Sequence, residues 1–183
     1  MANNTNTTRI LIAGFGGQGV LFVGKLLAYV GMAQDRQVSW LPSYGPEMRG
    51  GTANCSVILS SEPIGSPIVS EPDVLIAMNL PSFQKYQSAV RPGGAIVLDA
   101  SLIGEAPARK DVSYYALPAT QLATDEKLDG LSNMILLGRF LEACLPTSAE
   151  MTEKALRKVV PAKKEHLLAA NQKAIALGRA YRG

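Results

Sequence analysis

Two glycine-rich segments hold the residues of this sequence whose types and spacing could do chemistry. The first, residues 14–19 (GFGGQG), follows a short apolar run and precedes a stretch with apolar residues at helical spacing. A glycine loop between a strand and a helix leaves backbone N–H groups free at a helix N-terminus, which suits an anion or a closely packed partner chain. We therefore treat Gly16, Gly17, Gln18 and Gly19 as candidate site residues.

The second segment, residues 43–51 (SYGPEMRGG), lies between two predicted strands. Its glycines let a neighbour approach the backbone closely, and Pro46 fixes the bend. Arg49 offers a planar fork for a carboxylate or a phosphate, and the alternative is an internal ion pair with Glu47 or Asp99. The candidate residues here and in the following strand are Tyr44, Glu47, Arg49, Gly50, Gly51 and Asn54.

The first glycine loop fits the G-x-G-x-x-G pattern of dinucleotide-binding proteins, but the rest of that site is missing. Such sites place an acidic residue at the tip of the second strand, whereas this strand ends in SWLP (39–42). Residues 19–25 (GVLFVGK) also match the first seven positions of a P-loop. However, Leu26 replaces the Ser or Thr that would bind magnesium. The sequence argues against both nucleotide sites.

Catalytic side chains and metal ligands are scarce. The single histidine, His166, lies in a basic C-terminal stretch with no serine or cysteine placed as its partner, so we expect it on an exposed helix surface. Cys55 and Cys144 fall in a predicted strand and a predicted helix, where small buried hydrophobic residues are expected. Their number and spacing do not fit a disulfide scaffold, zinc or an iron–sulfur cluster. We predict no catalytic residue, metal or cofactor in this chain alone.

Strands and helices alternate along the chain, which predicts an α/β fold. It would be a three-layer α/β/α, Rossmann-like domain with a mostly parallel central sheet and a helical C-terminal part. Asp99 ends a strand where such sheets bind ligands, and it is equally placed to cap a turn or a helix. We expect residues 1–8 to be a disordered leader and residues 9–183 to be one domain. The predicted strands are 9–14, 37–41, 52–59, 73–78, 95–98 and 112–117, and the predicted helices are 18–32, 81–90, 131–144, one opened by the capping box Thr147-x-x-Glu150, and 161–180.

Composition excludes several protein classes. The chain is 47% hydrophobic and 18% charged, without an apolar run of the roughly 18 residues that a membrane span needs. Its start, MANNTNTTR, lacks the apolar core of a secretion signal. From Met151 onward 8 Lys and Arg stand against 2 Glu, but these charges alternate with apolar residues as on amphipathic surface helices. We expect a cytoplasmic protein with reduced thiols that binds neither nucleic acid nor membrane.

Four stretches in this order, GFGGQGV, SYGPEMRGGTANCSV, PDVLIAM and GGAIVLDASL, resemble the gamma subunit of 2-oxoacid:ferredoxin oxidoreductases. The 2-oxoglutarate synthase type is more similar than the pyruvate type. The resemblance is strong over residues 9–102 and general over the helical remainder. It implies a multi-subunit enzyme that oxidatively decarboxylates a 2-oxoacid with thiamine diphosphate. That enzyme transfers the acyl group to coenzyme A and passes electrons through iron–sulfur clusters to ferredoxin.

The resemblance also implies a division of labour. Thiamine diphosphate, Mg and the iron–sulfur clusters would belong to alpha and beta partner subunits, with a ferredoxin-like delta subunit as a further candidate. This chain would supply assembly surface and, through the candidate residues, an edge of the active or coenzyme A site. The 2-oxoacid, coenzyme A and ferredoxin would meet it through the complex. The alternative is a free-standing nucleotide-binding α/β protein, which would bind NAD, FAD or ATP as an isolated chain.

The two glycine segments carry one further expectation. Both should leave the carboxyl edge of the sheet and lie side by side there. Phe15, Tyr44, Pro46 and Met48 would then project apolar area with few charges around it, which is the composition of an interface core.

Overall fold

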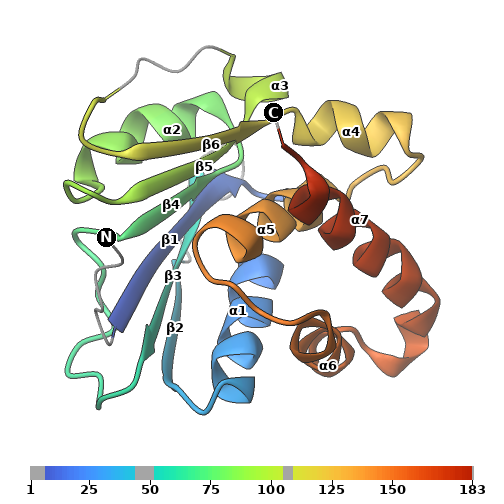
Figure 1. Ribbon diagram of the computed structural model, residues 1–183, viewed down its shortest axis with the longest axis horizontal. Helices are drawn as coiled ribbons and strands as arrows, with labels where there is room; N and C mark the ends of the chain where they lie inside the picture. Colours follow the sequence, from blue (N-terminus) through green and yellow to red (C-terminus); the bar gives the residue numbers. More distant parts are fainter. Residues whose placement is uncertain (1–6, 44–51, 105–108, 183) are drawn as a thin grey trace.

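The computed structural model describes residues 7–43, 52–104 and 109–182 and shows a six-stranded sheet between layers of helices (Figure 1). The strand order is β2-β3-β1-β4-β5-β6. The strands are β1 (Thr7–Phe15), β2 (Gln37–Ser43), β3 (Thr52–Ser60), β4 (Val74–Ala77), β5 (Ala95–Asp99) and β6 (Ser113–Leu117).

The sheet is mixed. Strands β1, β4, β5 and β6 run parallel to one another, as the alternation of strands and helices predicts. Strand β3 runs antiparallel to both β1 and β2. The chain between β2 and β3 is too short for the helical crossover that a parallel pair requires, so these two strands pair antiparallel. The predicted α/β class is confirmed, and β3 is the antiparallel exception.

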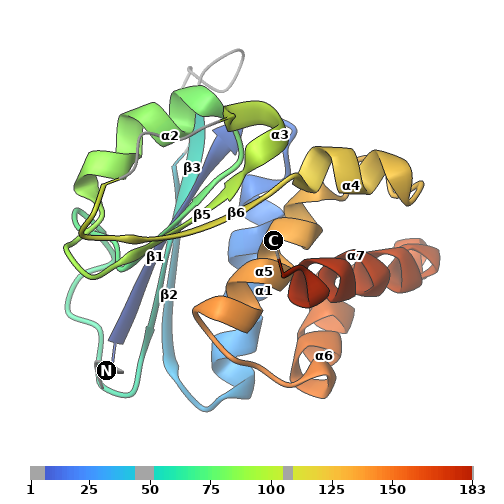
Figure 2. The same ribbon diagram turned by 45° about the horizontal axis from the view of Figure 1, so that its top comes forward.

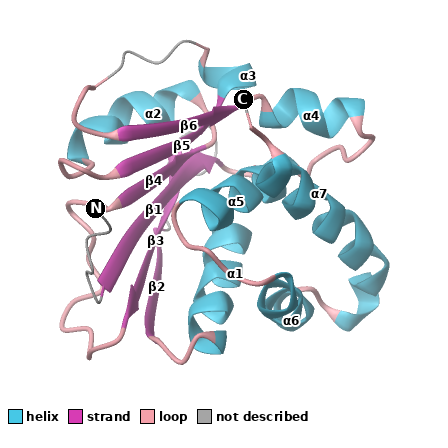
Figure 3. Cartoon of the chain, in the orientation of Figure 1, coloured by secondary structure: helices cyan, strands magenta, loops and turns pink. Residues whose placement is uncertain are grey.

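Helices cover both faces of the sheet (Figure 2). On one face α1 packs on β2 and β3 and α5 on β5 and β6, while α2 packs on β1 and β4 from the other side. Helix α6 packs on α1 and α7 on α5, which gives the predicted helical C-terminal part (Figure 3). The helices are α1 (Val20–Ala33), α2 (Leu80–Tyr86), α3 (Ala100–Ile103), α4 (Ala119–Asp125), α5 (Ser132–Ala143), α6 (Ala149–Val159) and α7 (Leu168–Ala180), with 3-10 turns η2 (Gln87–Ala89) and η3 (Ala162–Leu167).

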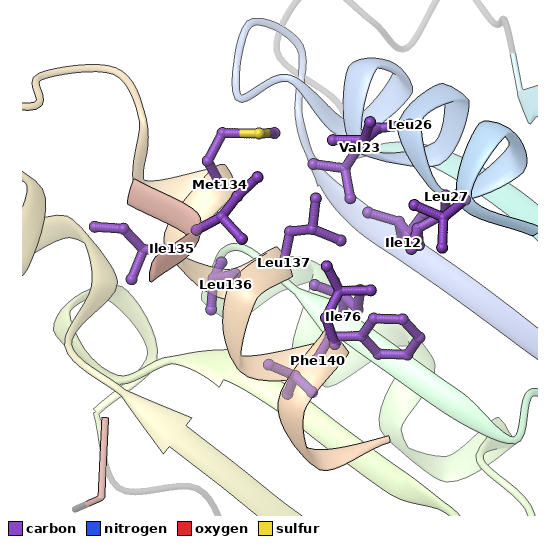
Figure 4. Packing of buried hydrophobic residues seen from close by; sticks show 14 of the residues in the cluster. Ile12, Val23, Leu26, Leu27, Ile76, Met134, Ile135, Leu136, Leu137 and Phe140 are labelled. Atoms are coloured by element: carbon purple, nitrogen blue, oxygen red, sulfur yellow. The ribbon is translucent and has the colours of Figure 1, made fainter. Parts of the chain in front are cut away.

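The core has two parts, one on each face of the sheet, because successive side chains of a strand point to opposite faces. Ile10 and Ile12 of β1 face α1 and α5, whereas Leu11 and Ala13 face α2. Both sets are buried, which explains why this strand is a continuous apolar run. Leu26 and Leu27 of α1, Ile76 of β4 and Leu137 and Phe140 of α5 meet in the larger part (Figure 4).

The helices differ from prediction at several places. Helices α3 and α4 are not among the predicted ones, and the predicted helix 81–90 is divided into α2 and η2. Helix α6 is capped by Ser148, whose Oγ accepts a hydrogen bond from Met151 N at 3.1 Å. The predicted capping residue, Thr147, instead donates its hydroxyl to Leu145 O at 2.7 Å. The predicted helix 161–180 is divided into η3 and α7, and η3 itself is kinked at Lys164, which has a non-helical backbone conformation.

Helices α5 and α7 cross with their backbones in contact. A Cβ on Gly178 would overlap the carbonyl oxygen of Ile135, and a Cβ on Gly138 would overlap that of Ile175. At the crossing point, therefore, only glycine fits without displacing the other helix, and this holds for both helices. Across the described residues, none of the helices combines the length and the apolar character needed to cross a membrane.

Candidate functional site

The first glycine loop is a tight turn between β1 and α1. Gln18 N donates to Phe15 O at 3.2 Å, which closes a turn with Gly16 and Gly17 at its centre. Gly17 has a φ of +97° and Gly19 a φ of +77°. Only glycine adopts this left-handed conformation without strain, so the backbone of the turn requires glycine at both positions.

Gln18 ties this turn to the neighbouring parallel strand. Its Oε1 accepts from Phe15 N at 2.7 Å and from Asn79 Nδ2 at 2.8 Å, and its Nε2 donates to Met78 O at 3.1 Å. Asn79 is buried, and its Oδ1 accepts from Ser82 N at 2.9 Å as the N-cap of α2. One side chain thus links the end of β1, the end of β4 and the start of α2.

Among the residues that the structure describes, none caps the N-terminus of α1, which is open. It has no side-chain cap and no acidic residue in its first turn. The first intrahelical bond runs from Val23 N to Gly19 O at 3.0 Å, so the preceding N–H groups have no intrahelical partner. A cleft of about 230 Å³ lies beside them, lined by Phe15, Gly16, Gly17, Gly19, Val20, Leu21, Phe22 and Ala53. Free N–H groups and the positive end of a helix dipole suit an anion.

The P-loop match in this region has no structural counterpart, because its residues from Val20 onward form helix α1. Lys25, which would contact phosphates in a P-loop, is exposed on that helix. Val23 is fully buried in the core, as expected for a helix residue.

Most of the second segment, residues 44–51, lies outside the described residues. This applies to Tyr44, Glu47, Arg49, Gly50 and Gly51, and to Pro46 and Met48. Its neighbours in the chain are placed: Thr52 pairs with Phe15 of β1, and Ser43 pairs with Asn54 of β3. The segment therefore begins and ends at the edge where β1 ends, and its own position stays a prediction.

Asn54 is the one candidate residue of that region whose contacts are described. Its Nδ2 donates to the hydroxyl of Tyr86 in α2 at 3.1 Å. Three exposed apolar side chains lie at the same edge, where β1, β4 and β5 end. Phe15, the last residue of β1, is 39% exposed, and Leu80 and Leu102, which follow β4 and β5, are 39% and 44% exposed. Phe15 thus projects apolar area as expected.

Asp99 has a structural role. It is 1% exposed, and its Oδ1 accepts from Ser101 N at 3.0 Å as the N-cap of α3. Its Oδ2 accepts from the hydroxyl of Thr120 at 2.6 Å. Of the two interpretations of Asp99 from the sequence, the cap is the one that the geometry supports.

Two asparagines at this edge, Asn79 and Asn133, are absent from the sequence-based candidates. Asn79 directly follows the apolar run 73–78, and Asn133 begins an apolar helix after Leu131. The sequence signal that could have identified them is a polar residue at the end of a buried strand or at the start of a buried helix. His166, by contrast, is exposed on η3 as expected.

Neither cysteine has the character of a nucleophile. Cys55 is buried and accepts a hydrogen bond from Trp40 Nε1 at 3.1 Å. Burial raises the pKa of the Cys55 thiol from an ordinary 9.0 to about 12, and it raises the pKa of Cys144 in the same way to about 12. No group of three or more His, Cys, Asp and Glu side chains gathers in the part of the chain that the structure describes.

These pKa values predict slow thiol chemistry. The thiolate is the reactive form, so at pH 8 the folded chain should react with Ellman's reagent on the order of 10³-fold more slowly than the denatured chain. A raised pKa also means that the folded state holds these protons more tightly than the unfolded chain. Both thiols therefore favour folding below about pH 9, and this contribution is lost as the pH rises towards 12. Equal reaction rates before and after denaturation would contradict the burial of both thiols.

Comparison with known proteins identifies a matching family and shows how the length of this chain compares with that of a relative. The model of the family described as pyruvate ferredoxin/flavodoxin oxidoreductase matches residues 9–181. Ketoisovalerate oxidoreductase subunit VorA of Methanothermobacter thermautotrophicus is 38% identical over 173 residues. The match covers 93% of this chain and 35% of VorA, so the chain spans about a third of that relative's length.

Two solved structures have the same fold. One is the gamma subunit of keto/oxoacid ferredoxin oxidoreductase from Geobacter sulfurreducens, with a TM-score of 0.80 and 27% identity over 93% of this chain and 95% of that chain. The other is 2-oxoglutarate:ferredoxin oxidoreductase from Magnetococcus marinus with 2-oxoglutarate, coenzyme A and succinyl-CoA bound. It has a TM-score of 0.84 and 27% identity over 97% of this chain and 31% of that chain.

Proposed function

Because the chain belongs to the pyruvate ferredoxin/flavodoxin oxidoreductase family, we propose that it is the gamma subunit of a multi-subunit 2-oxoacid:ferredoxin oxidoreductase. The observation that carries this proposal is the match to the Geobacter gamma subunit, which covers nearly the whole of both chains. The enzyme would convert a 2-oxoacid, such as 2-oxoglutarate or 2-ketoisovalerate, to its acyl-CoA and pass the electrons to ferredoxin in the cytoplasm.

The remaining parts of the enzyme would be separate chains. In VorA and in the Magnetococcus protein the region similar to this chain is about a third of a longer polypeptide. We assign the cofactors of the enzyme, which are thiamine diphosphate with Mg and the iron–sulfur clusters, to alpha and beta subunits, and to a delta subunit where one exists. This chain has two cysteines, Cys55 and Cys144, which is fewer than the four thiolates that hold an iron–sulfur cluster, so we derive no step through these groups here.

The carboxyl edge of the sheet would be the surface with which this subunit contacts a partner subunit and the substrate. Phe15, Leu80 and Leu102 give it exposed apolar area, which suits contact with a partner subunit. The open N-terminus of α1 offers N–H donors that suit the phosphates of coenzyme A. We propose that Gly16 to Gly19, Asn54 and the predicted residues of the segment 44–51 lie at the rim of the coenzyme A or oxoacid site.

The alternative, a free-standing nucleotide-binding protein, has less support. In a Rossmann site the second strand lies beside the first, and its acidic tip reaches the ribose of the cofactor. Here β3 separates β2 from β1, so the tip of β2 is one strand further from the glycine loop. Saturable binding of NAD, FAD or ATP to the isolated chain would favour this alternative.

The test of the proposed function is turnover with and without partners. The isolated chain should fold but show no 2-oxoacid-dependent reduction of ferredoxin or methyl viologen, even with thiamine diphosphate, Mg²⁺ and coenzyme A supplied. The chain co-expressed with its alpha and beta subunits should co-purify with them and restore this activity. Measurable turnover by the single chain, or full activity of the partners without it, would end the proposal.

A further inference from the structure

A polar pocket lies at the amino edge of the sheet, where β4, β5 and β6 begin, opposite to the edge that carries the glycine loop (Figure 1). Its lining includes Thr8 near the start of β1, the turn 91–94 before β5, Ser113 and Tyr115 of β6, and Cys144 just after α5. Its volume of about 380 Å³ lies in the range of pockets that hold small molecules.

Arg91 lines this pocket with donors that the described part of the chain leaves without acceptors. Its Nε is buried and lies 2.5 Å from Asp73 Oδ1, in an ion pair that lacks the alignment of a hydrogen bond. None of the described residues accepts a hydrogen bond from Nη1 or Nη2, and 31% of the Arg91 side chain is exposed. Because a guanidinium carries five donors in a planar fork, this end of Arg91 can bind two oxygens of a phosphate or a carboxylate.

The charges around the pocket favour an anion. Asp73 is the one carboxylate among the described residues that line it, and its Oδ2 also accepts from Arg9 N at 2.6 Å and lies 4.0 Å from Arg9 Nη1. The guanidinium of Arg139 lies over the ring of Tyr115, 5.3 Å from its centre. The buried Nε of Arg139 has no acceptor within the described residues. The guanidinium groups of Arg9, Arg91 and Arg139 therefore face a single carboxylate.

Other negative charges in this region do not cancel that excess. Asp111 and Glu142 lie close in the chain to residues of the pocket, but their carboxylates are paired with Arg109 at 2.6 Å and with Arg182 at 3.4 Å. The C-terminal end of α5 contributes about half a negative charge, which the guanidinium of Arg139 on the same helix offsets. The pocket therefore keeps a local excess of positive charge.

We propose that this pocket binds a small molecule through an oxyanion group, a phosphate or a carboxylate, held by the fork of Arg91. The hydroxyls of Thr8, Ser113 and Tyr115 also line the pocket and have no hydrogen-bond partner among the described residues. They can donate to further oxygens of the ligand. The site is a property of this chain alone, so it does not rest on the proposed function.

The test is a titration of the full chain with inorganic phosphate and, separately, with succinate, with chloride holding the ionic strength constant. At least one probe should shift the backbone amide resonances of residues 93–95 and 113–115 in a saturable way. The probe that binds more tightly identifies the oxyanion as a phosphate or a carboxylate. Arg91→Lys keeps the positive charge but loses the planar fork, so we expect binding of that probe weaker by at least about tenfold.

The matched control is Arg157→Lys, the same change at an exposed arginine of α6 that pairs with Glu153 at 2.8 Å, and it should bind the probe like the wild type. Tyr115→Phe is a second variant that keeps the ring beneath Arg139 and removes only the hydroxyl, so binding should weaken roughly threefold. No saturable shift with either probe in the wild type, or unchanged binding in the folded Arg91→Lys variant, would overturn the proposal. If Arg91→Lys does not fold, unchanged binding in Tyr115→Phe overturns it.

Discussion

Replacing Gly178 by alanine should lower the free energy of unfolding by about 3 kcal/mol, near the upper end of the usual cost of overpacking. The reason is the nature of the neighbour. The new Cβ would overlap the backbone carbonyl of Ile135, which cannot rotate away as a flexible side chain can. Relief requires α7 to move away from α5, and Gly138 makes the reciprocal contact with Ile175 at the same crossing. Both helices would lose packing against the core.

Thermal unfolding measures this effect. For a domain of this size, about 3 kcal/mol corresponds to a fall in Tm of roughly 6–12 °C. The matched control is Gly65→Ala, since a Cβ on Gly65 would have no atom within 4 Å. That variant should stay within about 0.5 kcal/mol of the wild type. A Gly178→Ala protein as stable as the Gly65→Ala protein would show that the two helices do not cross in backbone contact.

The sequence was sufficient for most of the fold, because buried parallel strands are short apolar runs whichever helices cover them. The runs 9–14, 73–78 and 95–98 are such strands, and they correspond to β1, β4 and β5. The sequence was not sufficient for the strand order or direction, because β2 and β3 have the same local residue pattern whether they pair parallel or antiparallel. Helix α6 shows a limit at shorter range: Thr147 and Ser148 are both capping residue types, and only the structure decides between them.

The sequence predicted the glycine turn of the candidate site but not the residues that the turn contacts. Glycine at positive φ is a local requirement of the backbone, so the turn at Gly17 and Gly19 is visible in the sequence. The partners of the loop are not, because they come from distant parts of the chain. Gln18 bonds to Met78, which is 60 residues away, and Gly19 contacts Asn133 of α5. Such contacts follow from the strand order and helix packing, which the sequence pattern leaves open.

Replacing Gln18 by leucine should reduce the turnover of the assembled enzyme on the order of 10²-fold, the size expected when a site is misplaced by about 1 Å. Leucine has a similar size but removes the acceptor for Phe15 N and Asn79 Nδ2 and the donor to Met78 O. These three bonds hold the glycine turn against the end of β4. Their loss should also lower the free energy of unfolding by about 2–3 kcal/mol, at about 1 kcal/mol for each bond.

The control and the paired readouts separate a role in activity from a role in stability alone. Gln121→Leu makes the same change at an exposed residue that donates one bond, to Asp125 Oδ1 at 2.8 Å, so turnover and stability should both stay near wild type. For Gln18→Leu, turnover is measured at a temperature well below the Tm of the variant, so that unfolding does not contribute. If stability falls as expected but turnover is unchanged, Gln18 supports the fold only, and the rim of the active site must lie elsewhere. If turnover falls while the Gln121 variant is normal, the geometry of the glycine turn is needed for activity, because Gln121→Leu makes the same change of side chain away from that turn.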